Sequence, residues 1–119
     1  KWAVKRIPKN LEKSVAAPEG QKLYEEFSLP SIPVEAIFEI AKLQRLLKSE
    51  LHRVTNPILM LHGKGDRVAP QLNVGLVKKL VASDIVESVI LPRSRHVVSM
   101  DFDKEIVASS IVDFFKRFA

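Results

Sequence analysis

Two apolar runs in the second half of the chain constrain its fold more than any other feature. They cover residues 58–61 and residues 85–91, and the second ends before Pro92. The run 58–61 is continuous, as is typical of a strand that is buried on both faces of a parallel sheet, and residues 85–91 are rich in β-branched residues, which strands favour. Residues 71–82, which lie between them, have the apolar spacing of a helix. We therefore predict a strand–helix–strand unit with parallel strands and a right-handed connection.

Further helices are predicted on either side of this unit, which makes the fold class α/β with parallel strands and flanking helices. Residues 34–51 repeat apolar side chains at spacings of three and four, and residues 103–118 do the same, with Asp101 or Asp103 as a cap. Apolar residues of two helices are expected to face the core: Leu72, Leu76, Val77 and Leu80, and Val107, Ile111, Phe114, Phe115 and Phe118. The stripe Ile37, Ile40, Leu43 and Leu47 is expected to serve mainly in packing and partly as pocket lining. Residues 1–33 hold four of the seven prolines, so only short helical pieces, around residues 19–27, are expected there.

Two residues with catalytic chemistry follow the two predicted strands. Asp66 lies in the loop after the first strand, and His96 lies in the loop after the second. Open α/β sheets place their active sites at the carboxyl edge, and neighbouring parallel strands lie about 5 Å apart. We therefore expect Asp66 and His96 to lie within hydrogen-bonding reach. Each also has a plainer interpretation, because Gly65-Asp66 is a common turn pair and a lone loop histidine usually has no catalytic role.

The two loops resemble a known family. His62-Gly63-x-x-Asp66-x-Val68-x-Pro70 resembles the acid loop of α/β-hydrolases, in particular of bacterial carboxylesterases and monoacylglycerol-lipase-like serine hydrolases. Ser94-Arg95-His96 resembles the histidine loop of that family, which often reads Ser-Gly-His, so Arg95 departs from the pattern. The resemblance covers residues 53–119 well. Residues 1–52 match only in character, as a lid-like segment and its helix.

The resemblance implies a reaction and two catalytic roles. The chain would be the C-terminal half of a serine hydrolase, and its two strands the last two of the hydrolase sheet. A serine would attack the carbonyl of a carboxylic ester, with His96 as base and then acid and Asp66 orienting His96. No cofactor is implied. None of the ten serines has glycine at both minus two and plus two, so the nucleophile elbow is missing and the chain alone is expected to be inactive.

Composition argues against several other functions, namely metal binding, nucleic-acid binding and membrane spanning. The chain has no cysteine, and His62 has no second ligand near it in sequence, so we expect no metal site. The net charge of +5 is spread evenly, with ten basic and seven acidic residues in 1–55 and nine and seven in 56–119, so we expect no nucleic-acid partner. No apolar stretch is long enough to span a bilayer. The chain begins at Lys1, which suggests a fragment or processed form, and a cytoplasmic location is expected.

The sequence leaves the partners open. A small acyl ester is the expected substrate of the intact enzyme. The sheet edge left without a neighbour is expected to be covered by the missing N-terminal half or by self-association. A split enzyme, in which another chain supplies the serine, is one alternative. A non-catalytic interaction module or an inactive fragment, in which Asp66 and His96 have no chemical role, is another.

Overall fold

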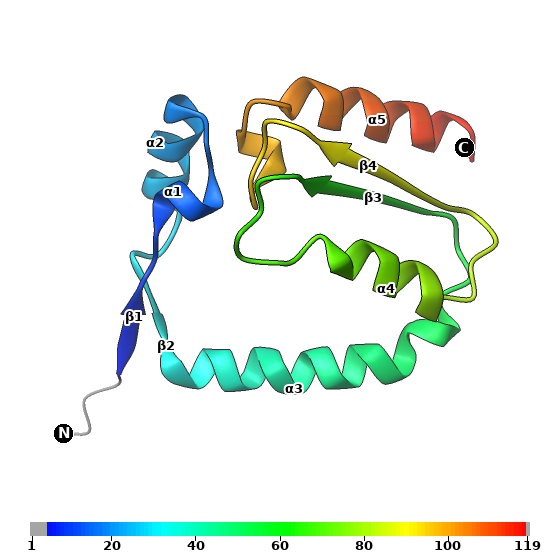
Figure 1. Ribbon diagram of the computed structural model, residues 1–119, viewed down its shortest axis with the longest axis horizontal. Coiled ribbons are helices and arrows are strands. Elements are labelled where there is room, and N and C mark those ends of the chain that lie inside the picture. Colours follow the sequence, from blue (N-terminus) through cyan, green and yellow to red (C-terminus); the bar gives the residue numbers. More distant parts are fainter. Residues whose placement is uncertain (1–4, 119) are drawn as a thin grey trace.

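The structure is a computed structural model, and it describes residues 5–118. Residues 1–4 and 119 of the expected segments 1–52 and 53–119 therefore lie outside the described residues. The elements form two small sheets, β1–β2 and β3–β4, with helices around them (Figure 1). The helices are α1 (Leu11–Ser14), α2 (Pro18–Phe27), α3 (Val34–Glu50), α4 (Leu72–Leu80) and α5 (Lys104–Lys116), with short 3-10 turns η1 (Leu51–Arg53) and η2 (Val98–Met100).

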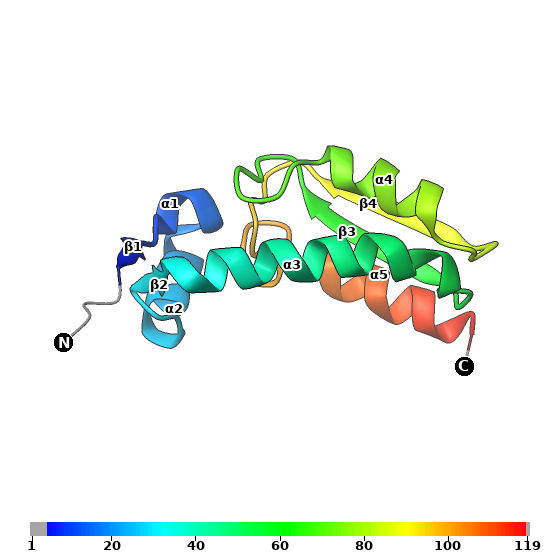
Figure 2. The same ribbon diagram turned by 90° about the horizontal axis from the view of Figure 1, so that it is seen from below.

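The predicted strand–helix–strand unit is present. Strands β3 (Ile58–Gly63) and β4 (Val86–Leu91) pair in parallel and in register from Ile58 and Val86 to Gly63 and Leu91, with α4 between them in sequence. Leu59 lines a hollow with α5, whereas Met60 and His62 line one with α4, and Leu61 borders both hollows. Because successive strand residues point to opposite faces, α4 and α5 cover opposite faces of this sheet (Figure 2). The α/β class and the parallel pairing are confirmed.

The core is small, and this corrects the prediction that the strand at residues 58–61 is buried on both faces. Among the described residues the buried hydrophobic side chains are Val15, Leu91, Val107 and Phe114. The first five residues of β3 are only half-buried, because among residues 5–118 only β4 pairs with β3, along one of its edges. The radius of gyration is 16.3 Å, larger than the roughly 13.5 Å typical of a compact domain of this length. The second edge of β3 and much apolar surface are therefore open.

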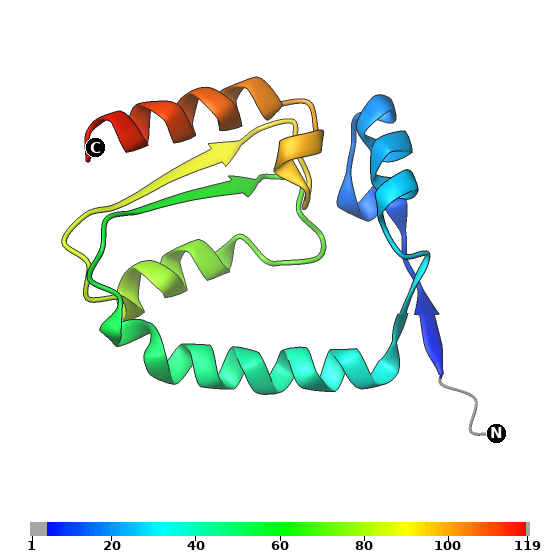
Figure 3. The ribbon, with the colours of Figure 1, turned by 180° about the vertical axis from the view of Figure 1, so that it is seen from behind.

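Several helix residues that were expected to be buried are exposed. Helix α3 ends one residue before the predicted boundary, and none of its residues is buried. Its stripe Ile37, Ile40, Leu43 and Leu47 is 43–53% exposed, so the packing interpretation is wrong for most of its length. The reason is that α3 lies apart from the sheet and only its C-terminal half lies beside α4 (Figure 3). The exposed residues also include Leu72, Leu76, Ile111, Phe115 and Phe118, whereas Val107 and Phe114 are buried as predicted.

Residues 5–33, here called the N-terminal segment, form more structure than their prolines suggested. Helix α2 contains the predicted residues 19–27, but α1 and the antiparallel pair β1 (Arg6–Pro8) and β2 (Ser31–Pro33) were not predicted. Strands of three residues are too short to show a period in the sequence. In Figure 1 helices α1 and α2 of this segment lie opposite the carboxyl ends of β3 and β4. The N-terminal segment is therefore close to the loops that hold Asp66 and His96.

Candidate active site

Asp66 closes the turn that follows β3. Its backbone N–H donates to the Gly63 carbonyl at 3.1 Å, and its Oδ1 accepts the N–H groups of Val68 at 2.7 Å and Ala69 at 2.9 Å. These bonds are those of a turn residue. They occupy Oδ1 and fix the carboxylate, so Oδ2 is left to meet another side chain. The interpretation of Asp66 as a turn residue therefore accounts for the contacts of Oδ1 but not for those of Oδ2.

The loop after β4 lies directly on this turn. The Gly65 N–H donates to the Ser94 carbonyl at 3.0 Å, and the Lys64 N–H donates to the Leu91 carbonyl at 2.8 Å. Gly63 has no positive φ; what it provides is space, since a Cβ at this position would lie 2.1 Å from the Arg95 carbonyl oxygen. The parallel register thus brings the two loops into backbone contact.

The expected pairing of Asp66 with His96 is observed. Asp66 Oδ2 lies 2.9 Å from His96 Nδ1, although the residues are thirty positions apart in sequence. The Asp66 side chain is 4% exposed and that of His96 is 39% exposed. A carboxylate at this distance favours the tautomer with the proton on Nδ1 and leaves Nε2 as the basic nitrogen. A histidine held in this way can take a proton from a nucleophile and return it to a leaving group.

The carboxylate of Asp66 stays ionised in this environment. Burial raises its pKa, but the hydrogen bonds from the Ala69 N–H, the His96 ring and the Val68 N–H outweigh burial, so the pKa lies below its ordinary value of 3.8. The negative charge is therefore present at neutral pH and can stabilise a positive imidazole on His96.

His62 lies next to the pair, in β3. Its Nε2 is 3.8 Å from Asp66 Oδ2, which is too long for a hydrogen bond, and this buried atom has no hydrogen-bond partner. Within residues 5–118, no cluster of three or more histidine, cysteine, aspartate or glutamate side chains is arranged to hold a metal ion. His62 therefore lies beside the Asp66 carboxylate, and its own Nε2 is left without a hydrogen bond.

Asp101 and Asp103 do not cap α5 in the predicted way. Asp103 occupies the N-cap position, but its carboxylate accepts from the Arg93 N–H at 2.8 Å and the Ser94 hydroxyl at 2.9 Å. Asp101 accepts four backbone N–H groups, including that of Arg95. Burial raises both pKa values, but these hydrogen bonds outweigh burial and the pKa values lie below 3.8. Both carboxylates organise the histidine loop, a role that the capping prediction missed.

Arg95, the departure from the family pattern, also contacts the N-terminal segment. Its φ is not positive, so the loop does not need the glycine that is common here. Its guanidinium donates to the Glu12 carbonyl, near the end of α1. The arginine therefore links the histidine loop to α1.

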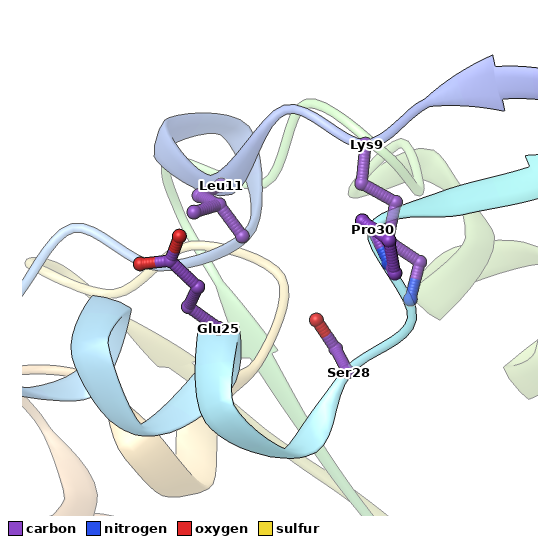
Figure 4. A pocket seen from close by; sticks show the side chains of 5 residues that line it. All are labelled: Lys9, Leu11, Glu25, Ser28 and Pro30. Carbon is purple, nitrogen blue, oxygen red and sulfur yellow. The ribbon is translucent and has the colours of Figure 1, made fainter.

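Two hollows on the surface are not lined by the Asp66–His96 pair. The one in Figure 4 has a volume of about 370 Å³ and belongs to the N-terminal segment, where Lys9, Leu11, Glu25, Ser28 and Pro30 line it. A larger one of about 590 Å³ lies between α3 and α4. Neither is lined by Asp66 or His96, so neither is the acyl pocket of a site centred on this pair.

Comparisons with known proteins agree with the resemblance seen in the sequence. The chain is 27% identical, over 79% of its length, to the thermostable monoacylglycerol lipase of Bacillus sp. (strain H-257). It is similar, with a TM-score of 0.72 and 29% identity over 76% of its length, to a solved structure from work on the metagenome-derived lipolytic enzymes LipS and LipT. No protein-family model matches the chain. The chain spans only 38% of the lipase and 37% of the solved chain.

These likenesses confirm the resemblance to part of a lipase- or esterase-type α/β-hydrolase. No helix within residues 5–118 combines the length and the apolar character needed to cross a membrane.

Proposed function

We propose that the chain supplies the acid and the base of the catalytic triad in a lipolytic serine hydrolase. Asp66 orients His96, and Nε2 of His96 takes the proton of a serine hydroxyl that attacks the carbonyl of a carboxylic ester. The protonated His96 then gives this proton to the leaving alkoxide, and water releases the acyl group in the same way. The distance of 2.9 Å between Asp66 Oδ2 and His96 Nδ1 carries the proposal.

The serine and the oxyanion donors come from polypeptide outside these 119 residues. This proposal rests on the lack of a serine with glycine at both flanking positions and on the open edge of β3, where a further strand of a hydrolase sheet would pair. The strands β3 and β4 would then be the last two of that sheet, and residues 1–52 the lid-like part. Esters of the monoacylglycerol type are the proposed substrates, since the lipase named above is similar to this chain.

Reaction of the native material with a fluorophosphonate, followed by intact-mass measurement, tests the proposal. A labelled serine is expected in a polypeptide that contains this chain or is bound to it. In the same material, His96→Ala and Asp66→Asn are expected to lower hydrolysis of p-nitrophenyl esters by about 10³–10⁴-fold. His52→Ala is the matched control, because His52 lies exposed in η1 and should leave the rate unchanged.

Two results would overturn the proposal. One is a complete lack of both labelling and ester hydrolysis, which would instead favour a non-catalytic interaction module. The other is hydrolysis that survives His96→Ala at the same rate as His52→Ala.

A further inference from the structure

Asp101 has an environment that capping of α5 does not explain. Its side chain is 1% exposed, and its two oxygens accept four backbone N–H groups from three separate parts of the chain. Oδ1 accepts from Ala17 at 2.8 Å and from Phe102 at 2.9 Å. Oδ2 accepts from Ala16 at 2.9 Å and from Arg95 at 2.8 Å. One carboxylate thus joins the histidine loop to the N-terminal segment.

The residues on both sides of His96 are held through this junction. On one side, the Arg95 N–H is bound by Asp101. On the other, the Val97 N–H donates to the Ser14 carbonyl at 2.9 Å. The backbone of His96 is therefore held by a hydrogen bond on each side. Both bonds belong to the contact between the histidine loop and residues 14–17, here called the junction. The direction in which the imidazole leaves the loop depends on both.

The packing around the junction leaves little freedom. Val15, which lies between Ser14 and the other two residues that make these bonds, Ala16 and Ala17, is 0% exposed. Helix α2 packs closely against η2, the turn that precedes Asp101, since a Cβ on Gly20 would lie 1.8 Å from the Met100 carbonyl oxygen. Four N–H donors around an ionised carboxylate form strong, charge-assisted bonds, and losing the carboxylate leaves buried donors unpaired.

We propose that Asp101 is a positioning residue, which sets the imidazole of His96 against Asp66 by binding the histidine loop to residues 14–17 of the N-terminal segment. The inference deepens the proposed function, because the pair it positions is the proposed acid and base. It also assigns the N-terminal segment a role at this site: residues 14–17 help to hold the backbone on both sides of His96.

The test is the tautomer of the neutral His96 ring, read from long-range ¹H–¹⁵N correlations of the full chain. Contact with Asp66 selects the Nδ1–H form. Asp101→Asn has the same shape but places an amide N–H₂ where an oxygen accepted two donors. We expect this variant to move the tautomer ratio of His96 at least halfway toward that of Asp66→Ala. Amide exchange of Ala16, Ala17 and Arg95 should accelerate at the same time.

A control separates positioning from general loss of stability. Val107→Ala removes buried volume from α5 and should destabilise the chain without changing the His96 tautomer, since Val107 has no part in the junction. Spectra are compared at a temperature where urea curves show both variants folded. If Asp101→Asn does not fold, Ser14→Pro and Ala16→Pro are used instead, because they disturb the junction from the N-terminal segment. The tautomer ratio of His96 is then measured in these variants.

The outcomes are distinct from those of the proposed function. An unchanged His96 tautomer in folded Asp101→Asn, or an equal change in Val107→Ala, would overturn the positioning role even in an active hydrolase. A shifted tautomer supports it whether or not the native material reacts with a fluorophosphonate. In an active hydrolase, the same variant should lower kcat and leave KM unchanged, because it acts on the base rather than on substrate binding.

Discussion

Gly63 and Arg95 lie so close that no side chain fits between them. A Cβ on residue 63 would be 2.1 Å from the Arg95 carbonyl oxygen and 2.6 Å from that of Ser94. Gly63 ends β3, and Arg95 precedes His96. The distance between the acid turn and the histidine loop therefore depends on the absence of a side chain at position 63.

Gly63→Ala is expected to force the two loops apart. The substitution should lower the free energy of unfolding by about 1–3 kcal/mol, as overpacking does, and should weaken the contact between Asp66 and His96. Gly75→Ala is the matched control, because apart from its chain neighbours and the backbone of its own helix no atom lies within 4 Å of a Cβ at that position in α4. It should instead stabilise the chain by about 0.5–1 kcal/mol, since alanine is a better helix former than glycine. Urea unfolding of both variants checks the opposite signs, and equal effects would contradict the close-contact argument.

Acid should destabilise the chain through its buried carboxylates. The pKa values of Asp66, Asp101 and Asp103 lie below 3.8 in the folded chain because hydrogen bonds outweigh burial, so folding is favoured by the ionised forms. The stabilisation is complete above the unfolded-state pKa of 3.8 and is lost as pH falls through the lower folded-state values. Urea midpoints measured from about pH 6 down to about pH 2 should fall steeply below about pH 4.

Asp101→Asn should flatten this acid dependence. Glu87→Gln is the comparison, because the pKa of Glu87 is also lowered, by hydrogen bonds from Arg117, but its side chain is 40% exposed and exposed pairs contribute little. An acid profile that is equally steep in wild type and Asp101→Asn would show that this carboxylate is not linked to folding.

The unpaired Nε2 of His62 is expected to lower the free energy of unfolding. Nε2 is buried with no hydrogen bond, and a buried unsatisfied polar atom costs about 1–3 kcal/mol. His62→Leu removes that atom while keeping apolar contact with α4, so the free energy of unfolding should stay the same or rise by about 1 kcal/mol. His62→Ala, which removes contacts as well, should lower it. Thermal unfolding of the two variants distinguishes these signs, and a large loss in His62→Leu would show that attraction to Asp66 matters more.

The open side of β3 is expected to associate with other copies when nothing else covers it. Ile111 and Phe115 of α5 are exposed beside Leu59 and Leu61 at a hollow of about 480 Å³. Sedimentation velocity should show a mass that rises with concentration, and Phe115→Glu should reduce the rise. Phe27→Glu is the control, because Phe27 is 73% exposed in the N-terminal segment and not in this patch. A monomer at all concentrations would contradict the expectation.

The strands β3 and β4 and the helix α3 could be predicted, because the pattern of apolar residues within each segment determines them. The apolar runs gave β3 and β4, periodicity gave α3, and the parallel arrangement then placed Asp66 beside His96. Burial could not be predicted in the same way. Phe114 and Phe115 are neighbours in one helix pattern, but only what covers each of them decides that the first is buried and the second exposed.

The role of Asp101 was hidden for a different reason. Its position before α5 favoured the interpretation as a cap, whereas its partners Ala16 and Ala17 lie 85 and 84 residues away. No sequence period connects positions so far apart, and the strands β1 and β2 within the N-terminal segment are only three residues long.

The spacing of these contacts implies an order of folding. Asp66 and His96 are joined by a single strand–helix–strand unit, and contacts that are near in sequence form faster than contacts that close a long loop. The bonds of Asp101 to Ala16 and Ala17 close a loop of more than eighty residues. We therefore expect the two loops to meet first and the N-terminal segment to lock the histidine in place in a later, slower step.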